Sequence, residues 1–592
     1  MRKYFFKEPG EIREYLLASL GKIKPSIVLK NSLIIDVCSG DIYSGNVVIY
    51  KDRIVGVCSG HVKAEVEIDV KEKYLAPGFM DAHIHIESTL LTPPELSKIL
   101  LPHGVTSIFA DPHELANVLG VKSMRLLLKM TKNIPLRVFI EVPSRVPTAP
   151  GLETTGAQLD VRNVKRLLKV PYTVSLGELN YQNVLYGGYE YLRKIIAADE
   201  CGLIVNGHMA GLRGSMLDAM IAAGLVDDHE CISCEEAIER IRKGCAVMVR
   251  EGSTERNLED VIKAANKIKD TRMFLMCTDD KHPDDIVAEG HIDFNIRKAI
   301  ELGIDPVKAI QMATLNIAQH FGLECYVGSI APLRKADIVV LDDLEKIRVS
   351  EVIFDGKLAY SKGKLLWSIG KARTPKWALR TVRISQELQP RDLIITVGKQ
   401  YTKALVRVMR IIENQIVVKE ERAWLSVEGG IVKADEGRDI LHIAVVERHK
   451  GLRNIGKAFV RGFNIKNGAI GSTVAHDHHN VVVVGDNADD MFLAVKGLER
   501  MGGGFIVTSK HRVLAKLPLP IAGLISTEKA STVVEKIHEV NKAAQSLGCS
   551  LKKPFMQLSF ITLPTVPELG LTDKGLIDSR RYKVISPIII LT

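Results

Sequence analysis

Two histidines separated by a single residue, His83 and His85, close an apolar segment that begins at Leu75. Alternate side chains of a β-strand project from one face, so both imidazoles would lie side by side at the strand end. Imidazoles in this arrangement can bind one metal ion together. Two histidines that merely pack in a core are the simpler alternative, so a metal site needs further ligands elsewhere in the chain.

Such ligands follow at regular intervals. Seven further apolar segments between Val105 and Asp280 are typical of strands, and helical segments separate them. This alternation predicts a parallel sheet, and eight units predict a closed (β/α)₈ TIM-like barrel whose strand ends converge on one face. An open doubly wound sheet is the alternative, but no GxGxxG motif follows the first strand. The predicted strand ends carry His83, His85, Asp111, Glu141, Glu178, His208, His229, Arg250, Glu251 and Asp279.

This set of strand-end residues is suited to metal-assisted hydrolysis. A carboxylate at the end of the fourth strand, Glu178, would lie between two metal positions and could bridge them through both oxygens. Two close metal ions can activate a shared water molecule. A set this rich in carboxylates suits Mn²⁺ or Fe²⁺ at least as well as Zn²⁺. A purely stabilising role does not explain histidines and carboxylates at nearly every strand end.

A second group of polar residues lies far along the chain. His476, Asp477, His478, His479 and Asn480 directly precede the apolar segment that begins at Val481. Three histidines and an aspartate in four positions are unusual for a surface loop. Both a functional role and an ordinary polar turn remain open for this group.

The elements that must position these residues predict an α/β protein of several domains, because single cores stop growing near roughly 250–300 residues. Strand patterns before and after the barrel predict one small β-sandwich domain built from two segments. We expect the first segment within 1–74, the barrel over 75–330, the second segment with a connector over 331–384, and a further α/β domain over 385–592.

Composition excludes several classes of protein. The net charge of +10 arises from 80 basic and 70 acidic residues, and the densest basic run, Lys371–Arg383, contains only one aromatic residue. We therefore expect no nucleic-acid partner. No apolar run reaches about 18 residues, so we expect no membrane span. Nine cysteines, an odd number, predict reduced thiols and a cytoplasmic location, and the Cys231–Cys234 pair lacks a second pair for a zinc site.

Several motifs resemble known proteins. PGFMDAHIHIE and the later GSIAPLRKADIVVLD resemble the amidohydrolase superfamily. ADPHE, LGEL, DDHE, TDDKHPDD, AHDHHN and LPTVPELGLTDKGL are similar to the adenine deaminases of bacteria and archaea. The resemblance covers nearly the whole chain, including a C-terminal region that most amidohydrolases lack.

This resemblance implies hydrolysis of adenine to hypoxanthine and ammonia by a homo-oligomer, a dimer, at a centre of two divalent ions, with Mn²⁺ favoured over Fe²⁺ or Zn²⁺. It implies that Asp279 is a metal ligand and proton carrier, and that Glu178 and His229 also take part in catalysis. His229 could instead act mainly as a proton relay. The remaining implied ligands are His83, His85 and His208; Glu87, His113 and Glu114 are candidates for purine contact; and His476, Asp477, His479 and Asn480 are possible accessory residues.

The sequence departs from the family pattern at two places, and three alternative functions can be compared with adenine deamination. GELNYQNV is one residue shorter than the usual spacing after the bridging glutamate, and His478 stands where a small polar residue is expected. Another amidohydrolase acting on a cyclic amide would use the same metals. The zinc nucleobase deaminases share the His-x-Glu pattern of His85 and Glu87, but no PCxxC follows. A non-catalytic metal-binding protein would not need the full set of strand-end residues.

Overall fold

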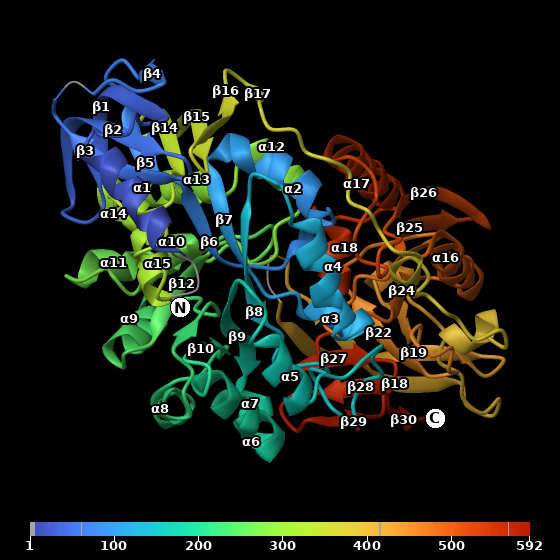
Figure 1. Cartoon of the computed structure of the whole chain (residues 1–592). Coiled ribbons are helices and arrows are strands. Elements are labelled where there is room, and N and C mark those ends of the chain that lie inside the picture. The colour runs from blue at the N-terminus through green and yellow to red at the C-terminus, as the bar shows by residue number, and fades with distance from the viewer. Residues whose placement is uncertain (1–5, 7, 61, 414–415, 566–567) are drawn as a thin grey trace.

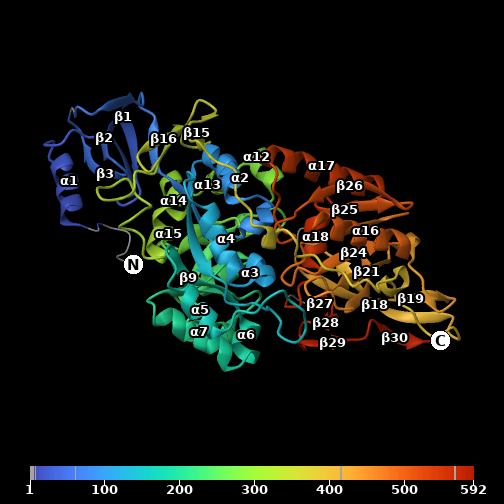
Figure 2. The same cartoon turned by 45° about the vertical axis from the view of Figure 1, so that its right-hand side comes forward.

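The computed structural model describes residues 6, 8–60, 62–413, 416–565 and 568–592. Three parts follow one another along the molecule: a β-rich part at the N-terminus, a central part of alternating strands and helices, and a C-terminal part coloured orange to red (Figures 1 and 2). Two positions of the LPTVPELGLTDKGL motif, 566 and 567, lie outside the described residues.

The β-rich part is one nine-stranded sheet to which two distant chain segments contribute. Strand β5 pairs antiparallel with β14, and Leu75 lies opposite Val340. This pairing joins the start of the chain to the segment that follows the central part. The strands are β1 Ile27–Asp36, β2 Asp41–Tyr50, β3 Arg53–Cys58, β4 Val66–Asp69, β5 Tyr74–Pro77, β14 Ile338–Asp343, β15 Arg348–Phe354, β16 Lys357–Ser361 and β17 Lys364–Leu365.

The central part contains all eight strands that the sequence predicts. Strands β6 to β10 form a five-stranded curled parallel sheet, and β11 to β13 form a second parallel sheet of three strands. Isolated parallel bridges connect Val205 with Leu225 and Ile84 with Asp279. The strands are β6 Phe79–Ile84, β7 Val105–Ala110, β8 Arg137–Val142, β9 Thr173–Asn180, β10 Ile204–His208, β11 Asp227–Asp228, β12 Ala246–Arg250 and β13 Phe274–Cys277.

Helices follow these strands and cover their outer side (Figure 1). The strand interiors are β-branched and apolar, whereas the connecting segments carry the amphipathic pattern of helices. The helices are α2 Pro93–Leu100, α3 His113–Leu119, α4 Lys122–Met130, α5 Val161–Leu167, α6 Tyr181–Tyr186, α7 Tyr189–Asp199, α8 Gly214–Ala222, α9 Cys234–Arg242, α10 Leu258–Val261, α11 Lys263–Lys267, α12 Pro283–Glu289, α13 Ile292–Glu301, α14 Pro306–Met312 and α15 Leu315–His320.

An aromatic core fills the space beneath the strand ends. The ring of Phe109 stacks on Phe139 and Phe321, with centroids 4.8 and 4.2 Å away. Side chains two positions apart share a face of a strand, so the residue two positions after an interior residue points to the same side of the sheet. This relation accounts for four polar strand ends, which follow buried core residues in the pairs Phe109 and Asp111, Phe139 and Glu141, Met248 and Arg250, and Cys277 and Asp279.

The C-terminal part is built around a ten-stranded mixed sheet that packs against the central part. Its polar turn, residues 476–480, lies between β23 Ala469–Ser472 and β24 Val481–Gly485. Helix α17, Ala530–Ser546, contacts α2 and α12 of the central part, and α16 Ala488–Met501 covers the sheet. The other elements are β18 Lys403–Ile411, β19 Val418–Glu428, β20 Ile431–Val432, β21 Leu441–Val446, β22 Ile455–Arg461, β25 Gly504–Ser509, β26 Arg512–Pro518, α18 Pro554–Phe560, β27 Leu569–Thr572, β28 Gly575–Asp578, β29 Lys583–Ile585 and β30 Ile588–Leu591.

Two general expectations can be compared with the structure directly. All nine cysteines have free thiols, as the sequence predicts. None of the helices in the described ranges is both long enough and apolar enough to cross a bilayer.

Candidate metal centre and active site

The two histidines at the end of β6 are held with their Nε2 atoms toward a common centre. His85 Nδ1 lies 2.9 Å from the backbone oxygen of Asp111, and His83 Nδ1 lies 2.7 Å from Oε2 of Glu141. A backbone carbonyl can only accept a hydrogen bond, so Nδ1 of His85 carries a hydrogen and Nε2 is the nitrogen that faces the centre. Nε2 of His83 is buried without a hydrogen-bond partner in the described part of the chain. Both rings are therefore oriented as metal ligands are.

Glu178, at the end of β9, lies between two groups of histidines. Its Oε1 is 3.7 Å from Nε2 of His85, and its Oε2 is 3.0 Å from Nε2 of His229 and 3.1 Å from Nδ1 of His208. The donor atoms of His83, His85 and Glu178 lie within 4.8 Å of one another, and so do those of Glu178, His208 and His229. Glu178 is thus common to both groups.

Asp279 completes the centre from the strand β13 side. Its Oδ1 lies 3.1 Å from Nε2 of His85 and 3.8 Å from Nε2 of His83, while Arg250 donates a 2.8 Å hydrogen bond to Oδ2. The backbone of Asp279 is left-handed, with φ of 58°, which aspartate tolerates better than most residues. Its amide donates to the His83 carbonyl at 2.9 Å, and its carbonyl accepts from the His85 amide at 3.1 Å. These bonds fix the carboxylate opposite the histidine pair.

The electrostatics of the centre favour a bound cation. Burial alone would raise the pKa of Glu178, but Arg145 and His208 lower it well below its ordinary value. Burial likewise opposes ionisation of Asp279, but the hydrogen bond with His85 and the charge of His229 hold its pKa well below its ordinary value. The pKa of His85 is lowered by burial and raised more strongly by Asp279 and its acidic neighbours. Protons and metal ions compete for such nitrogens, so this buried donor set fits divalent metal ions.

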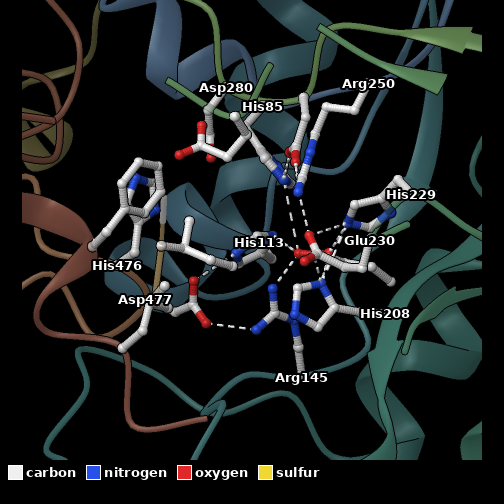
Figure 3. Close-up of a pocket in the computed structure, with 16 residues that line it drawn as sticks. His85, His113, Arg145, His208, His229, Glu230, Arg250, Asp280, His476 and Asp477 are labelled. Atoms are coloured by element: carbon white, nitrogen blue, oxygen red, sulfur yellow. Dashed lines mark hydrogen bonds and ion pairs between the residues drawn. The ribbon is translucent and has the colours of Figure 1, made fainter. Parts of the chain in front are cut away.

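A pocket opens onto the centre. Figure 3 shows His208 and His229 on one side of it and His476 and Asp477 on the other. The C-terminal part provides Ile416, His476, Asp477, Phe560 and Leu563, and the central part provides His85, His113, Arg145, Glu178, His208, His229, Glu230, Arg250, Glu255, Asp279 and Asp280. The pocket therefore lies between two parts of the chain.

Arg145 connects these two parts. It forms a buried ion pair with Glu178 and a second one with Asp477, whose Oδ2 lies 2.5 Å from Nη1. Oδ1 of Asp477 lies 3.3 Å from Nε2 of His113, the first residue of α3. Burial and the charge of Arg145 lower the pKa of His113. The hydrogen bonds with Asp111 and Asp477 have the larger, opposite effect and raise it to about 10. Asp477 therefore faces two cationic groups that also face Glu178 (Figure 3).

The structure brings most of the predicted site residues together but separates some from the pocket. His113 lines the pocket, whereas Glu87 and Glu114 are absent from its lining. Glu87 accepts a 2.8 Å hydrogen bond from the amide of Leu115, and Glu114 forms an ion pair with Nδ1 of His476. Glu87 and Glu114 thus lie behind the pocket wall.

The polar turn, residues 476–480, has one side toward the pocket and one side away from it. His476 and Asp477 line the pocket, whereas His479 is buried behind them. Asn480 points to the central part and donates a 3.0 Å hydrogen bond to the carbonyl of Thr154. His478, which departs from the family pattern, is buried with Nε2 3.3 Å from the carbonyl oxygen of Leu571. The whole turn is buried, which excludes an exposed polar loop.

Seven residues of the described pocket lining were not singled out from the sequence, namely Arg145, Glu230, Glu255, Asp280, Ile416, Phe560 and Leu563. Arg145 and Phe560 carry no local motif. Leu563 opens a quoted motif, but an apolar side chain gives no signal of its own. Glu230, which forms an ion pair with Arg250, could have been found because it ends the DDHE motif that contains His229.

Comparison with known proteins agrees with this geometry. The chain matches the amidohydrolase family over residues 74–359 and the adenine deaminase C-terminal domain over residues 415–583. An adenine deaminase from Desulforamulus reducens is 46% identical over 98% of this chain and 99% of its own. Adenine deaminases from Methanothrix thermoacetophila and Kosmotoga olearia are 41% and 38% identical, over 96% and 94% of this chain and 98% and 96% of their own. The chain belongs to the adenine deaminase family of the amidohydrolase superfamily.

Proposed function

We propose that this protein hydrolyses adenine to hypoxanthine and ammonia at a centre of two divalent metal ions. The observation that carries the proposal is the position of Glu178, whose carboxylate is shared by two groups of potential ligands. One ion would be held by His83, His85 and Glu178, with Asp279 facing both histidines. The other would be held by Glu178, His208 and His229.

Mn²⁺ is the ion that we propose for both positions. The carboxylates of Glu178 and Asp279 with four imidazoles form a mixed oxygen and nitrogen donor set, which suits Mn²⁺ and Fe²⁺ as well as Zn²⁺. We further propose that the eight central strands, over residues 75–330, act as one closed barrel. The two parallel bridges, Val205 with Leu225 and Ile84 with Asp279, support this closure because they join the edges of the two parallel sheets.

The residues around the centre suit a proton-transfer reaction. Bound divalent ions would polarise a water molecule and make it a nucleophile near neutral pH. Oδ1 of Asp279 faces the centre and can take a proton from the attacking water, while Arg250 holds Oδ2 in place. The same carboxylate can then deliver the proton to a ring nitrogen or to the leaving amino group. Water adds at C6 of adenine, the C6–N bond breaks, and ammonia leaves.

The C-terminal part provides the apolar side of the pocket. Phe560 lies in α18 with its ring stacked on His476, at a centroid distance of 5.0 Å and an angle of 13°. Leu563 and Ile416 pack with it along the pocket lining. A flat purine is favourably bound against such a surface, because its faces are apolar while its edge nitrogens need polar partners.

Phe560→Ala is expected to weaken adenine binding more than it slows chemistry. Base–aromatic stacking contributes about 1–3 kcal/mol per base, so KM should rise roughly 5- to 150-fold with a smaller change in kcat. Steady-state kinetics would measure this. Phe555→Ala is the matched control, because Phe555 lies in the same helix but stacks on Phe505, away from the pocket lining. An unchanged KM in Phe560→Ala would contradict the proposed wall.

A cyclic amide with a carboxylate group is the alternative substrate within the superfamily. It would need a cationic group to anchor that carboxylate. Both arginines of the described pocket lining are already paired, Arg145 with Glu178 and Asp477, and Arg250 with Glu230 and Asp279. The pocket therefore favours a neutral heterocycle such as adenine.

The substrate assignment can be tested with protein loaded with Mn²⁺. We expect release of one ammonia per adenine consumed, with hypoxanthine as the other product, and no hydrolysis of a carboxylated cyclic amide such as dihydroorotate. Removal of the metal with a chelator should abolish the activity, and Mn²⁺ should restore it. Hydrolysis of the cyclic amide by metal-loaded protein that leaves adenine unchanged would reject the proposal.

A further inference from the structure

A second group of potential metal ligands lies beside the pocket, where two parts of the chain meet. It consists of Glu114 from α3 and of His476 and His479 from the turn before β24. One donor atom of each residue lies within 4.8 Å of the others. None of the three belongs to the groups that share Glu178.

This Glu114–His476–His479 cluster is closed to solvent. Glu114 and His479 have no exposed surface, and His476 exposes 4% of its surface. Nε2 of His479 and Oε2 of Glu114 are buried without a hydrogen-bond partner among the residues that the structure describes. Buried polar atoms are nearly always paired, and an unpaired one is unfavourable. A bound cation would accept an electron pair from each of these two atoms and so provide the missing partner.

The charges around the cluster also favour a cation. Glu87 lies near it, and Oε2 of Glu87 is also buried without a hydrogen-bond partner among the described residues. Asp280 interacts electrostatically with His476. Three carboxylates thus lie near two imidazoles in a buried region beside the pocket. A divalent cation would balance their charge more completely than a single proton.

The contacts repeat the pattern of the centre around Glu178. There, imidazole nitrogens and carboxylate oxygens lie at hydrogen-bond distance from one another, and one nitrogen, Nε2 of His83, has no partner in the described ranges. Here, Nδ1 of His476 forms an ion pair with Glu114, while Nε2 of His479 has no partner among the described residues. The amide of Ala475 donates a long hydrogen bond of 3.4 Å to Nδ1 of His479, and a contact this long fixes the tautomer of the ring only weakly.

We propose that Glu114, His476 and His479 bind a third divalent metal ion, separate from the catalytic pair. Two imidazoles and one carboxylate favour a first-row transition ion such as Zn²⁺ over Mg²⁺ or Ca²⁺, which prefer oxygen ligands. The ion would join helix α3 to the C-terminal turn. Asp477 lies between the two histidine ligands in sequence, so the ion would also fix the carboxylate that pairs with Arg145 and His113.

The alternative is that His476 is protonated and simply forms a salt bridge with Glu114, with no metal. Metal analysis of purified protein after saturation with Zn²⁺ and removal of free ion separates the two. His479→Gln should bind one ion fewer than the wild type. His478→Gln is the matched control, because His478 lies in the same buried turn but contacts the Leu571 carbonyl instead, and it should bind as many ions as the wild type. Equal metal content in wild type and His479→Gln would overturn the proposal.

Two further measurements keep this test independent of the catalytic centre and of folding. Glu178→Ala should retain the third ion, and adding His479→Gln to that variant should remove it. If His479→Gln does not fold, anomalous diffraction from zinc-loaded wild-type crystals decides the question. A peak within coordination distance of Glu114, His476 and His479 supports the proposal, and its absence there overturns it, whatever is found at Glu178.

Discussion

Asp279→Asn is expected to reduce kcat for adenine by about 10²- to 10⁴-fold, the usual contribution of a positioned general acid–base group. The amide keeps the shape of the side chain and can still accept the hydrogen bond from Arg250. It cannot take a proton from water, so turnover should fall while metal content stays close to that of the wild type. Steady-state kinetics combined with metal analysis would measure both quantities on the same preparation.

Asp280→Asn is the control for this prediction. Asp280 also lines the pocket, but its carboxylate accepts a hydrogen bond from the hydroxyl of Ser88. It should lose much less activity than Asp279→Asn. Wild-type kcat in Asp279→Asn would show that another group carries the proton. A large loss of metal would instead show that Asp279 acts mainly as a ligand.

Glu178→Ala is expected to remove metal and activity together. Glu178 faces His85 through one oxygen and His208 and His229 through the other, and Arg145 holds it between them. Without the carboxylate, two groups of histidines lose their shared ligand, and Arg145 is left as a buried cation beside them. At least one of the proposed catalytic ions should be absent after dialysis, and adenine deamination should fall below detection.

Glu153→Ala provides the comparison for Glu178→Ala. Glu153 is also a buried glutamate of the central part, and its Oε1 accepts a hydrogen bond from the amide of Ala149. It lies outside the described pocket lining, so its loss should lower stability without lowering metal content. An unchanged metal count in Glu178→Ala would contradict the bridging role.

The position of the centre could be predicted from the sequence because the periodicity of a strand determines which of its side chains share a face. In β8, for example, Phe139 and Glu141 lie two residues apart and share a face, so a buried strand that ends in a carboxylate must present it above the core. The same reasoning applied to His83, Glu178, His208, His229 and Asp279, and the structure brings their side chains together. Strand patterns also indicated that the N-terminal sheet continues after the central part.

Contacts between distant parts of the chain could not be predicted in this way. Arg145 and Asp477 are separated by 332 positions, and no local pattern indicates that they form an ion pair. Phe560 has the periodicity of an ordinary core residue of α18. Glu114 and His113, both in the ADPHE motif, were candidates for purine contact, but neighbouring residues of a helix point in different directions. The helix directs His113 to the pocket and Glu114 to the C-terminal turn.

The most direct test of a catalytic centre bridged by Glu178 is anomalous diffraction at the manganese edge from crystals of the Mn²⁺-loaded protein. We expect two peaks beside Glu178, one near His83 and His85 and the other near His208 and His229, each within coordination distance of a Glu178 oxygen. A single peak in this region, or peaks that Glu178 does not contact, would contradict a catalytic centre bridged by this residue.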